Sequence, residues 1–376
     1  MENKKLNINA IKTKMEEFGV NQSELAGQLD VSRECVSQWL KGENFPKPRM
    51  LLELAKKLNL KFEQIVIRDQ SQDPVIAFRK KAGVRTTDAD YERARDMGEI
   101  LKHLVSYLPY SKISRPASLA NPESDYYYVQ EAAREVRSTL KLKNDIINFT
   151  DLIKHFIDLH ATIIPVMWGP KNRHENALHI YLPDSMTTWI YLNLDTNIID
   201  FKFWMAHELG HVKTPNLEGD ESEDFTDRFA GALLYPMEMA KSAYHDLIKM
   251  KNKGAVINRI KDIASDYIIS PITVLKEINK YAEVMNLSPV DVDIFAAARN
   301  FCKEFPSVTE DLFNRELPDA SLYIKTTGKV FDTCFFKILK KYLKDEGKSS
   351  GFVQRVLDLP LTDAEDIYRY LISASK

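Results

Sequence analysis

Two histidines four positions apart, with a glutamate directly after the first, lie near the middle of the chain, where residues 207–211 read His-Glu-Leu-Gly-His. Positions four apart on an α-helix share one face, so His207 and His211 can each direct a ring nitrogen toward a single point. Glu208 then stands beside that point. Two imidazole ligands and an adjacent carboxylate that takes a proton from metal-bound water are the parts of a catalytic zinc centre. The spacing therefore predicts bound zinc with Glu208 as general base; the alternative is a histidine pair that shares a helix face by chance.

The residues around this motif predict a buried helix. Asp200 is the expected N-cap, and Phe203 and Trp204 precede the first histidine by one turn on the same side, where their apolar bulk would keep the site dry. Gly210 permits the close approach of another backbone, and Pro215 ends the helix.

Zinc held by two histidines needs a third protein ligand, and residues 218–227 carry six acidic side chains. Apolar residues at every fourth position predict a helix over residues 222–234, with the serine as its N-cap. Glu223 and Asp227 share a separate stripe with small residues, which favours close packing. We therefore expect Glu223 as the third ligand, and Asp227 as the group that holds a zinc-bound imidazole by its other N–H. Glu221 and Asp227 are the next candidates for the ligand, and the acids could instead form only a solvated helix start.

This stretch resembles the ImmA/IrrE-type zinc metallopeptidases. In that family His-Glu-x-x-His is followed by a helix with the pattern Glu-x-x-x-Asn-x-Phe-Ala-x-x-Leu-x-x-Pro, which residues 223–236 follow except at one position. The resemblance implies zinc on the two histidines and Glu223, Glu208 as general base, and cleavage of a repressor or antitoxin partner. Asp227 stands where the family usually has asparagine, which adds charge beside the metal, and Tyr235 stands where it usually has methionine.

Composition limits the protein class. A chain of 376 residues with 44% hydrophobic content can form two or three cores. The net charge of −2 means that any contact with nucleic acid must come from a local patch. Three widely spaced cysteines without a Cys-x-x-Cys pair exclude a cysteine zinc site and a disulfide framework. We expect a cytoplasmic protein without a membrane partner, because no apolar run reaches membrane-spanning length.

The first 69 residues predict a compact bundle of helices. Asn21 and Glu24 form a capping-box pattern, Ser32 is the expected N-cap of the next helix, and a glycine ends that helix. A tight turn at Asp30 joins the two short helices, as in a helix-turn-helix. Residues 22–42 resemble the lambda-repressor-like (Xre-type) domain, with Asp30 where the family has glycine at the turn.

That resemblance implies contacts with double-stranded DNA. The residues that it places at DNA are Gln22 at a phosphate, Ser32, Arg33, Ser37 and Gln38 toward the major groove, and Lys41, Lys47 and Arg49 along the backbone. Arg33 suits guanine and Gln38 suits adenine. A homodimer is the default, since such domains usually bind paired half-sites. The alternative is a module that uses this fold only for protein contacts.

Five more residues are candidates for a role at the metal centre. His174 and His179 are rival ligands, although an isolated histidine near a loop or strand end is more often structural, and the family pattern does not require them. Tyr181, Tyr191 and Tyr235 are candidates to donate a hydrogen bond to an oxyanion.

The predicted organisation is an all-α helix-turn-helix domain followed by an α+β zincin-like domain and a mostly helical C-terminal region. The expected segments are the DNA-binding domain at 1–69, a linker with a helix at 70–125, the metallopeptidase-like domain with three strands at 126–290, and a helical region of unknown role at 291–376. The linker helix, over residues 88–108, could separate or dimerise the domains.

A DNA-reading helix and a zinc centre on one chain indicate a prophage or stress regulator. We expect a DNA-binding transcriptional regulator that carries a zinc metallo-endopeptidase of the gluzincin type and hydrolyses a peptide bond in a partner regulator. The alternative is a non-enzymatic regulator or antitoxin whose zinc domain senses a ligand or binds a protein partner. Glu208 favours the enzyme, because a structural zinc site does not need it and usually has four protein ligands.

Overall fold

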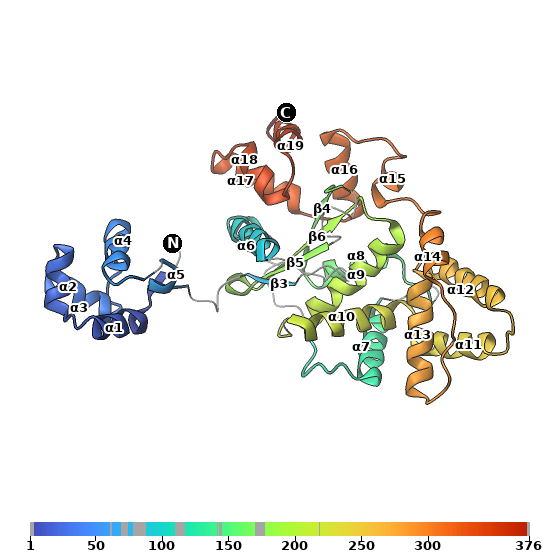
Figure 1. The fold of residues 1–376 in the computed structure, drawn as a ribbon. Helices are drawn as coiled ribbons and strands as arrows, with labels where there is room; N and C mark the ends of the chain where they lie inside the picture. The colour runs from blue at the N-terminus through green and yellow to red at the C-terminus, as the bar shows by residue number, and fades with distance from the viewer. Residues whose placement is uncertain are drawn as a thin grey trace. The chain divides into compact units, whose positions relative to one another are not determined.

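The computed structural model describes residues 4–60, 62–68, 74–77, 88–109, 117–140, 142, 145–169, 177–217 and 219–373. The chain forms two compact units, Met1–Asp73 and Pro74–Lys376, here called the N-terminal and the C-terminal unit. Both are mainly helical, and each contains a small sheet (Figure 1). Among the described residues, no helix is both long enough and apolar enough to cross a membrane.

The N-terminal unit is a helical bundle whose boundaries follow the local capping signals. Its elements are α1 (Ile8–Glu17), α2 (Gln22–Leu29), α3 (Arg33–Lys41), α4 (Pro48–Lys57) and α5 (Phe62–Ile65), with β1 (Lys4–Leu6) antiparallel to β2 (Val66–Arg68). Asn21 and Glu24 form the predicted capping box, and Ser32 caps α3. Asp30 turns the chain between α2 and α3 at φ 55°. The helix pattern of this unit is therefore confirmed, whereas the two short strands were not predicted.

A mixed sheet lies at the centre of the C-terminal unit. Its strand order is β3 (Val75–Ala77), β5 (Ala177–Leu182), β6 (Thr187–Asn193) and β4 (Thr162–Val166). Strand β4 runs parallel to β6, and the other neighbours are antiparallel. The three strands expected from β-branched runs are confirmed as β4, β5 and β6, and β3 adds an edge from a segment that was expected to be linker.

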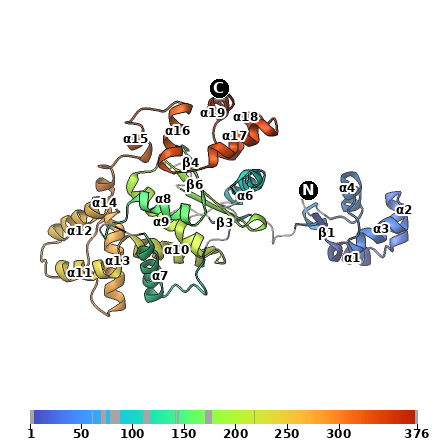
Figure 2. The same cartoon turned by 180° about the vertical axis from the view of Figure 1, so that it is seen from behind.

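Helices cover both faces of this sheet (Figures 1 and 2). α8 (Phe149–Asp158) contacts β4, and α9 (Ile198–Lys213) contacts β5 and β6. On the opposite face lie α6 (Asp88–Lys102) and α18 (Ser350–Leu357). A Cβ on Gly98 of α6 would lie 3.3 Å from Ile180 of β5. The hydroxyl of Tyr191 on β6 donates a hydrogen bond to the carbonyl of Val356 in α18 at 2.8 Å. The linker helix is thus α6, which ends at Lys102 and is part of this core rather than a spacer.

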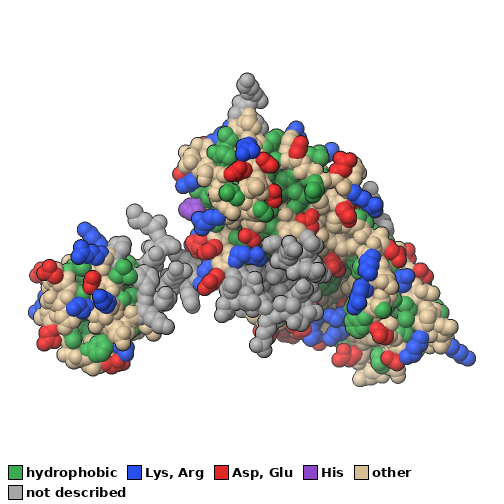
Figure 3. All heavy atoms as spheres, turned by 45° about the horizontal axis from the view of Figure 1, so that its top comes forward, with side chains coloured by type: hydrophobic (Ala, Val, Ile, Leu, Met, Phe, Trp, Pro, Cys, Tyr) green, Lys and Arg blue, Asp and Glu red, His purple; other side chains and the backbone are tan. Residues whose placement is uncertain are grey.

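The remaining helices complete the C-terminal unit. They are α7 (Tyr126–Thr139), α10 (Gly219–Leu234), α11 (Met237–Leu247), α12 (Lys253–Tyr267), α13 (Pro271–Val284), α14 (Phe295–Cys302), α15 (Val308–Leu312), α16 (Ala320–Val330), α17 (Phe335–Asp345) and α19 (Leu361–Ser373). Acidic and basic side chains intermingle on the face drawn in Figure 3.

Candidate metal centre and DNA-reading helix

Helix α9 carries both histidines of the motif and is buried along most of its length. It begins one residue after Asn197, whose side-chain oxygen accepts a hydrogen bond from the backbone N–H of Ile199. Asp200 lies in the first turn, so its predicted role as N-cap was wrong. The sheet covers α9 on one side and α10 packs against it on another, which explains why apolar residues occur all round the helix.

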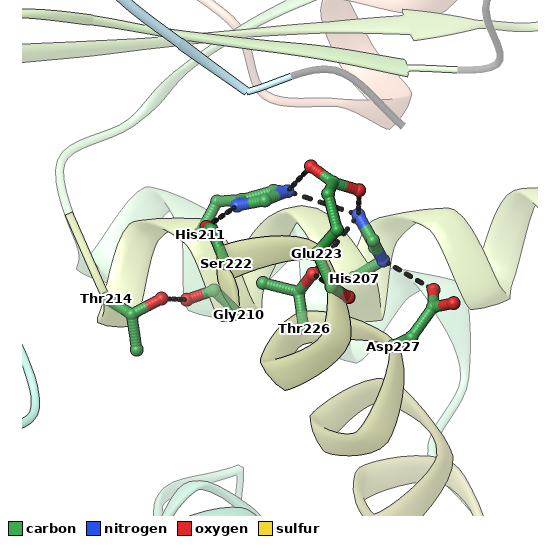
Figure 4. Close-up of polar contacts among 8 residues, drawn as sticks. All are labelled: His207, Gly210, His211, Thr214, Ser222, Glu223, Thr226 and Asp227. Carbon is green, nitrogen blue, oxygen red and sulfur yellow. Dashed lines mark hydrogen bonds and ion pairs between the residues drawn. The ribbon is translucent and has the colours of Figure 1, made fainter. Parts of the chain in front are cut away.

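Helices α9 and α10 approach closely at a glycine. A Cβ placed on Gly210 would lie 2.8 Å from Cγ2 of Thr226, closer than real Cβ atoms come to a neighbour, and 3.1 Å from the Cα of Thr226, which is tighter than most real Cβ contacts. Glycine therefore permits the backbone approach that was predicted for this position. The approach brings the first half of α10, including Glu223, over the two histidines (Figure 4).

Three side-chain atoms converge between the two helices. Nε2 of His207 lies 3.1 Å from Nε2 of His211, and these two nitrogens lie 3.5 and 3.3 Å from the two carboxylate oxygens of Glu223. Ligands bound tetrahedrally at about 2.0–2.1 Å from zinc are separated from one another by about 3.3 Å. The triangle therefore has the size that a single zinc ion requires.

The outward-facing nitrogens of both histidines are also held in place. Nδ1 of His207 lies 3.0 Å from Asp227, and Nδ1 of His211 lies 3.1 Å from the hydroxyl of Ser222 (Figure 4). Such partners fix the ring orientation and leave Nε2 for a metal. Ser222 was not predicted in this role, because α10 starts at Gly219 and places the serine inside the helix rather than at its N-cap.

The charges of the cluster are coupled. Burial lowers the pKa of His207, but its hydrogen bonds to Asp227 and Glu223 outweigh this and raise the pKa to about 9. Burial and the neighbouring His207 lower the pKa of His211. Burial raises the pKa of Glu223, but the two histidines outweigh it and the net direction is down. A third carboxylate, that of Glu208, is 2% exposed, and its charge also raises the pKa of His207. Three carboxylates around two imidazoles favour a positive charge between them, which either a proton or a metal cation can supply.

His179 lies over the cluster without joining it. Its ring stacks on His211 with centroids 6.0 Å apart and an interplanar angle of 17°. Burial, followed by the charge of His211, lowers the pKa of His179 to about 3, so this ring is neutral. Among the described residues, the group with metal-ligand spacing is His207, His211 and Glu223. His174 lies outside the described residues.

The three tyrosines proposed as oxyanion donors lie at different places relative to the metal cluster. Tyr191 extends from the sheet face opposite α9, toward α18. Tyr235 donates to the carbonyl of Met239 at 3.3 Å, beyond the end of α10. Tyr181 follows His179 by two residues on β5, and therefore shares its face of the sheet, toward α9. Tyr181 alone among the three is placed on the side of the metal cluster.

In the N-terminal unit, the predicted DNA-contacting residues lie at the start of α2, at the N-cap of α3 and on α3. Ser32, Arg33, Gln38 and Lys41 are exposed, and Gln22 and Ser37 are half-buried. The hydroxyl of Ser32 is engaged as the cap of α3, accepting from the backbone N–H of Cys35 at 3.2 Å. The carbonyl oxygen of the Gln38 side chain accepts from the amide of Asn44 at 2.8 Å, which orients the glutamine and was not foreseen.

Comparison with known proteins identifies the N-terminal unit. Residues 11–65 match the helix-turn-helix family. No curated protein and no solved structure matches the chain. The matched residues lie outside the unit that contains the metal cluster. Residues 11–65 are therefore a lambda-repressor-like helix-turn-helix domain, and the chain is a DNA-binding transcriptional regulator.

Proposed function

We propose that the C-terminal unit is a zincin-like, zinc-dependent endopeptidase that cleaves a partner regulator of this DNA-binding protein. The observation that carries the proposal is the triangle of His207, His211 and Glu223, whose ligand atoms all lie within 4.8 Å of one another. Two outer hydrogen bonds hold the imidazoles with Nε2 directed inward, and Glu208 follows the first ligand in sequence.

The residues of the cluster divide the chemistry among them. His207, His211 and Glu223 would hold the metal, which when bound supplies a Lewis acid for the scissile carbonyl and lowers the pKa of a water molecule. Glu208 accepts the proton of the attacking water and passes it to the leaving amine. Tyr181 would donate a hydrogen bond to the developing oxyanion.

Asp227 distinguishes this cluster from the family pattern, which has asparagine at that position. A carboxylate on Nδ1 of His207 makes the imidazole a stronger donor to the metal than an amide would. We expect Asp227→Asn to keep the ring orientation and to weaken zinc retention about 10- to 100-fold.

The experiment that tests the proposal compares Glu208→Gln with the wild type on a peptide library, with cleavage sites identified by mass spectrometry. The variant keeps the size of the side chain but cannot accept a proton, so zinc content stays unchanged while cleavage falls about a hundredfold or more. Glu221→Gln is the matched control, because Glu221 is an exposed acid on α10. Equal cleavage by Glu208→Gln and the wild type would contradict the assigned mechanism.

A further inference from the structure

A cavity of about 280 Å³ opens beside the metal cluster, between α9, α10 and α13. Its lining includes Asp227, which is bonded to His207, and Trp204, whose ring lies edge-on to the ring of His207 with centroids 5.3 Å apart. Figure 4 shows Asp227 on the other side of the His207 ring from Glu223. The cavity therefore adjoins the metal cluster through two residues that contact one of its histidines.

A buried carboxyl group lies against the wall of this cavity. Glu277 of α13 is 8% exposed, and its Oε1 lies 2.2 Å from the point where a Cβ on Gly231 of α10 would be, so a larger residue at position 231 would displace the carboxyl group. Within the described part of the chain, no side chain forms a hydrogen bond or an ion pair with Glu277. A buried carboxyl without such a partner is costly unless a ligand provides one.

The cations around the cavity are directed elsewhere. Arg228 forms an ion pair with Asp224 at 2.9 Å and donates to the carbonyl of Ser124 at 3.1 Å. Lys280 pairs with Glu283 at 3.8 Å. Lys276 is exposed at the rim. The most buried charged group of the lining is therefore the carboxyl group of Glu277, which favours a cationic occupant over an anionic one.

The size and walls of the cavity narrow the choice of occupant. Its volume is just below the range of about 300–1,000 Å³ that is typical of small-molecule sites, so it fits one long side chain better than a cofactor. Phe203 and Trp204 line it, and aromatic faces attract guanidinium and ammonium groups. Burial, partly offset by Lys276, Lys280 and Arg228, raises the pKa of Glu277 to about 8, so a bound cation can ionise it at little cost near neutral pH.

We propose that this cavity binds the lysine or arginine side chain of a partner polypeptide held at the metal cluster, with Glu277 as the counter-ion at its base. This inference rests on the proposed function in one respect: the cation is taken to come from the polypeptide that is cleaved. Glu277 would then select a substrate with a basic side chain near the cleavage site. The cation site itself does not depend on catalysis.

The test measures binding to the full-length, zinc-free chain by ligand-observed NMR. The probes are butylammonium, butyrate, and a short peptide with one lysine together with its side-chain-acetylated form. We expect butylammonium to bind and butyrate not to bind. The lysine peptide should bind at least tenfold more tightly than butylammonium, and acetylation should abolish that gain.

Two variants make the test specific. Glu277→Gln keeps the volume of the side chain and should weaken binding of both cations at least tenfold. Asp262→Asn, which changes an exposed acid of α12 outside the cavity lining, should leave binding unchanged. Preference for butyrate, or unchanged binding by Glu277→Gln, would overturn the cation site. Equal affinity for butylammonium and the lysine peptide would contradict the proposal that the bound cation belongs to a polypeptide. If cations bind as expected but the zinc-loaded wild type cleaves no library peptide, the proposed function fails and the cation site stands.

Discussion

Replacing Gly210 by alanine tests whether the close approach of α9 and α10 builds the metal cluster. The added Cβ would lie 2.8 Å from Cγ2 of Thr226 and 3.1 Å from its Cα, and the second of these atoms is backbone that moves only with α10. Overpacking of this kind costs about 1–3 kcal/mol. Alanine also gains about 1 kcal/mol of helix propensity over glycine, which must be subtracted.

Gly328→Ala is the matched control for this effect. Gly328 lies within α16 of the same unit, and a Cβ there would meet no atom within 4 Å. Both variants gain the same helix propensity, so the difference between them isolates the overpacking cost. At about 2–4 °C per kcal/mol, Gly210→Ala should melt about 2–12 °C below Gly328→Ala in scanning calorimetry of the full-length chain.

The same variant should also lose zinc affinity, because a displaced α10 carries Glu223 away from the histidines. Adding Thr226→Ala removes the 2.8 Å contact and should recover part of both losses. Equal melting temperatures for Gly210→Ala and Gly328→Ala would refute the reasoning, since the helices would then not be in the contact that positions the third ligand.

Three further predictions concern the metal, the buried acid and DNA. The purified chain should hold about one zinc, and His211→Ala or Glu223→Ala should lose most of it by elemental analysis; full retention by Glu223→Ala would place the third ligand elsewhere. Glu277 has a folded pKa of about 8, above its value of 4.5 in the unfolded chain, so its ionisation destabilises the fold increasingly as pH rises from about 4.5 to 8. Glu277→Gln should therefore gain stability over the wild type between pH 5 and pH 8 in urea unfolding, by up to a few kcal/mol, and a constant difference would contradict the burial of this carboxyl. In DNA titrations, Arg33→Ala should cost about 1–3 kcal/mol at one base position, whereas Lys41→Ala should weaken all sequences alike; the reverse pattern would exchange their roles.

The sequence was most informative where local physics decides the structure. Capping residues at Asn21 and Ser32 predicted the starts of α2 and α3, because these side chains bond the first free N–H groups of a helix. The same rule failed at Asp200 and Ser222, where other residues start the helices and the side chains in question lie within them. Several residues near a helix start can cap it, so composition alone does not choose among them.

The long-range packing could not be predicted in this way. The apolar face of α6 was visible in its periodicity, but nothing local indicates that it packs on β5 rather than on another domain. Burial of Tyr191 under α18 joins residues 165 positions apart. The cavity beside Asp227 likewise depends on long-range packing, because Glu277 comes from a third helix whose position depends on the whole fold.

Expression of a reporter from the promoter of the chain's own gene tests most directly in cells whether a peptidase reaction at this cluster controls the DNA-binding regulator. The reporter is measured with the wild type, Glu208→Gln and His207→Ala, each produced at the same level. If cleavage drives regulation, Glu208→Gln and His207→Ala should both fail to respond to the inducing condition, although Glu208→Gln still holds zinc. A full response by Glu208→Gln together with failure of His207→Ala would contradict control by the peptidase reaction and assign the cluster to binding or sensing.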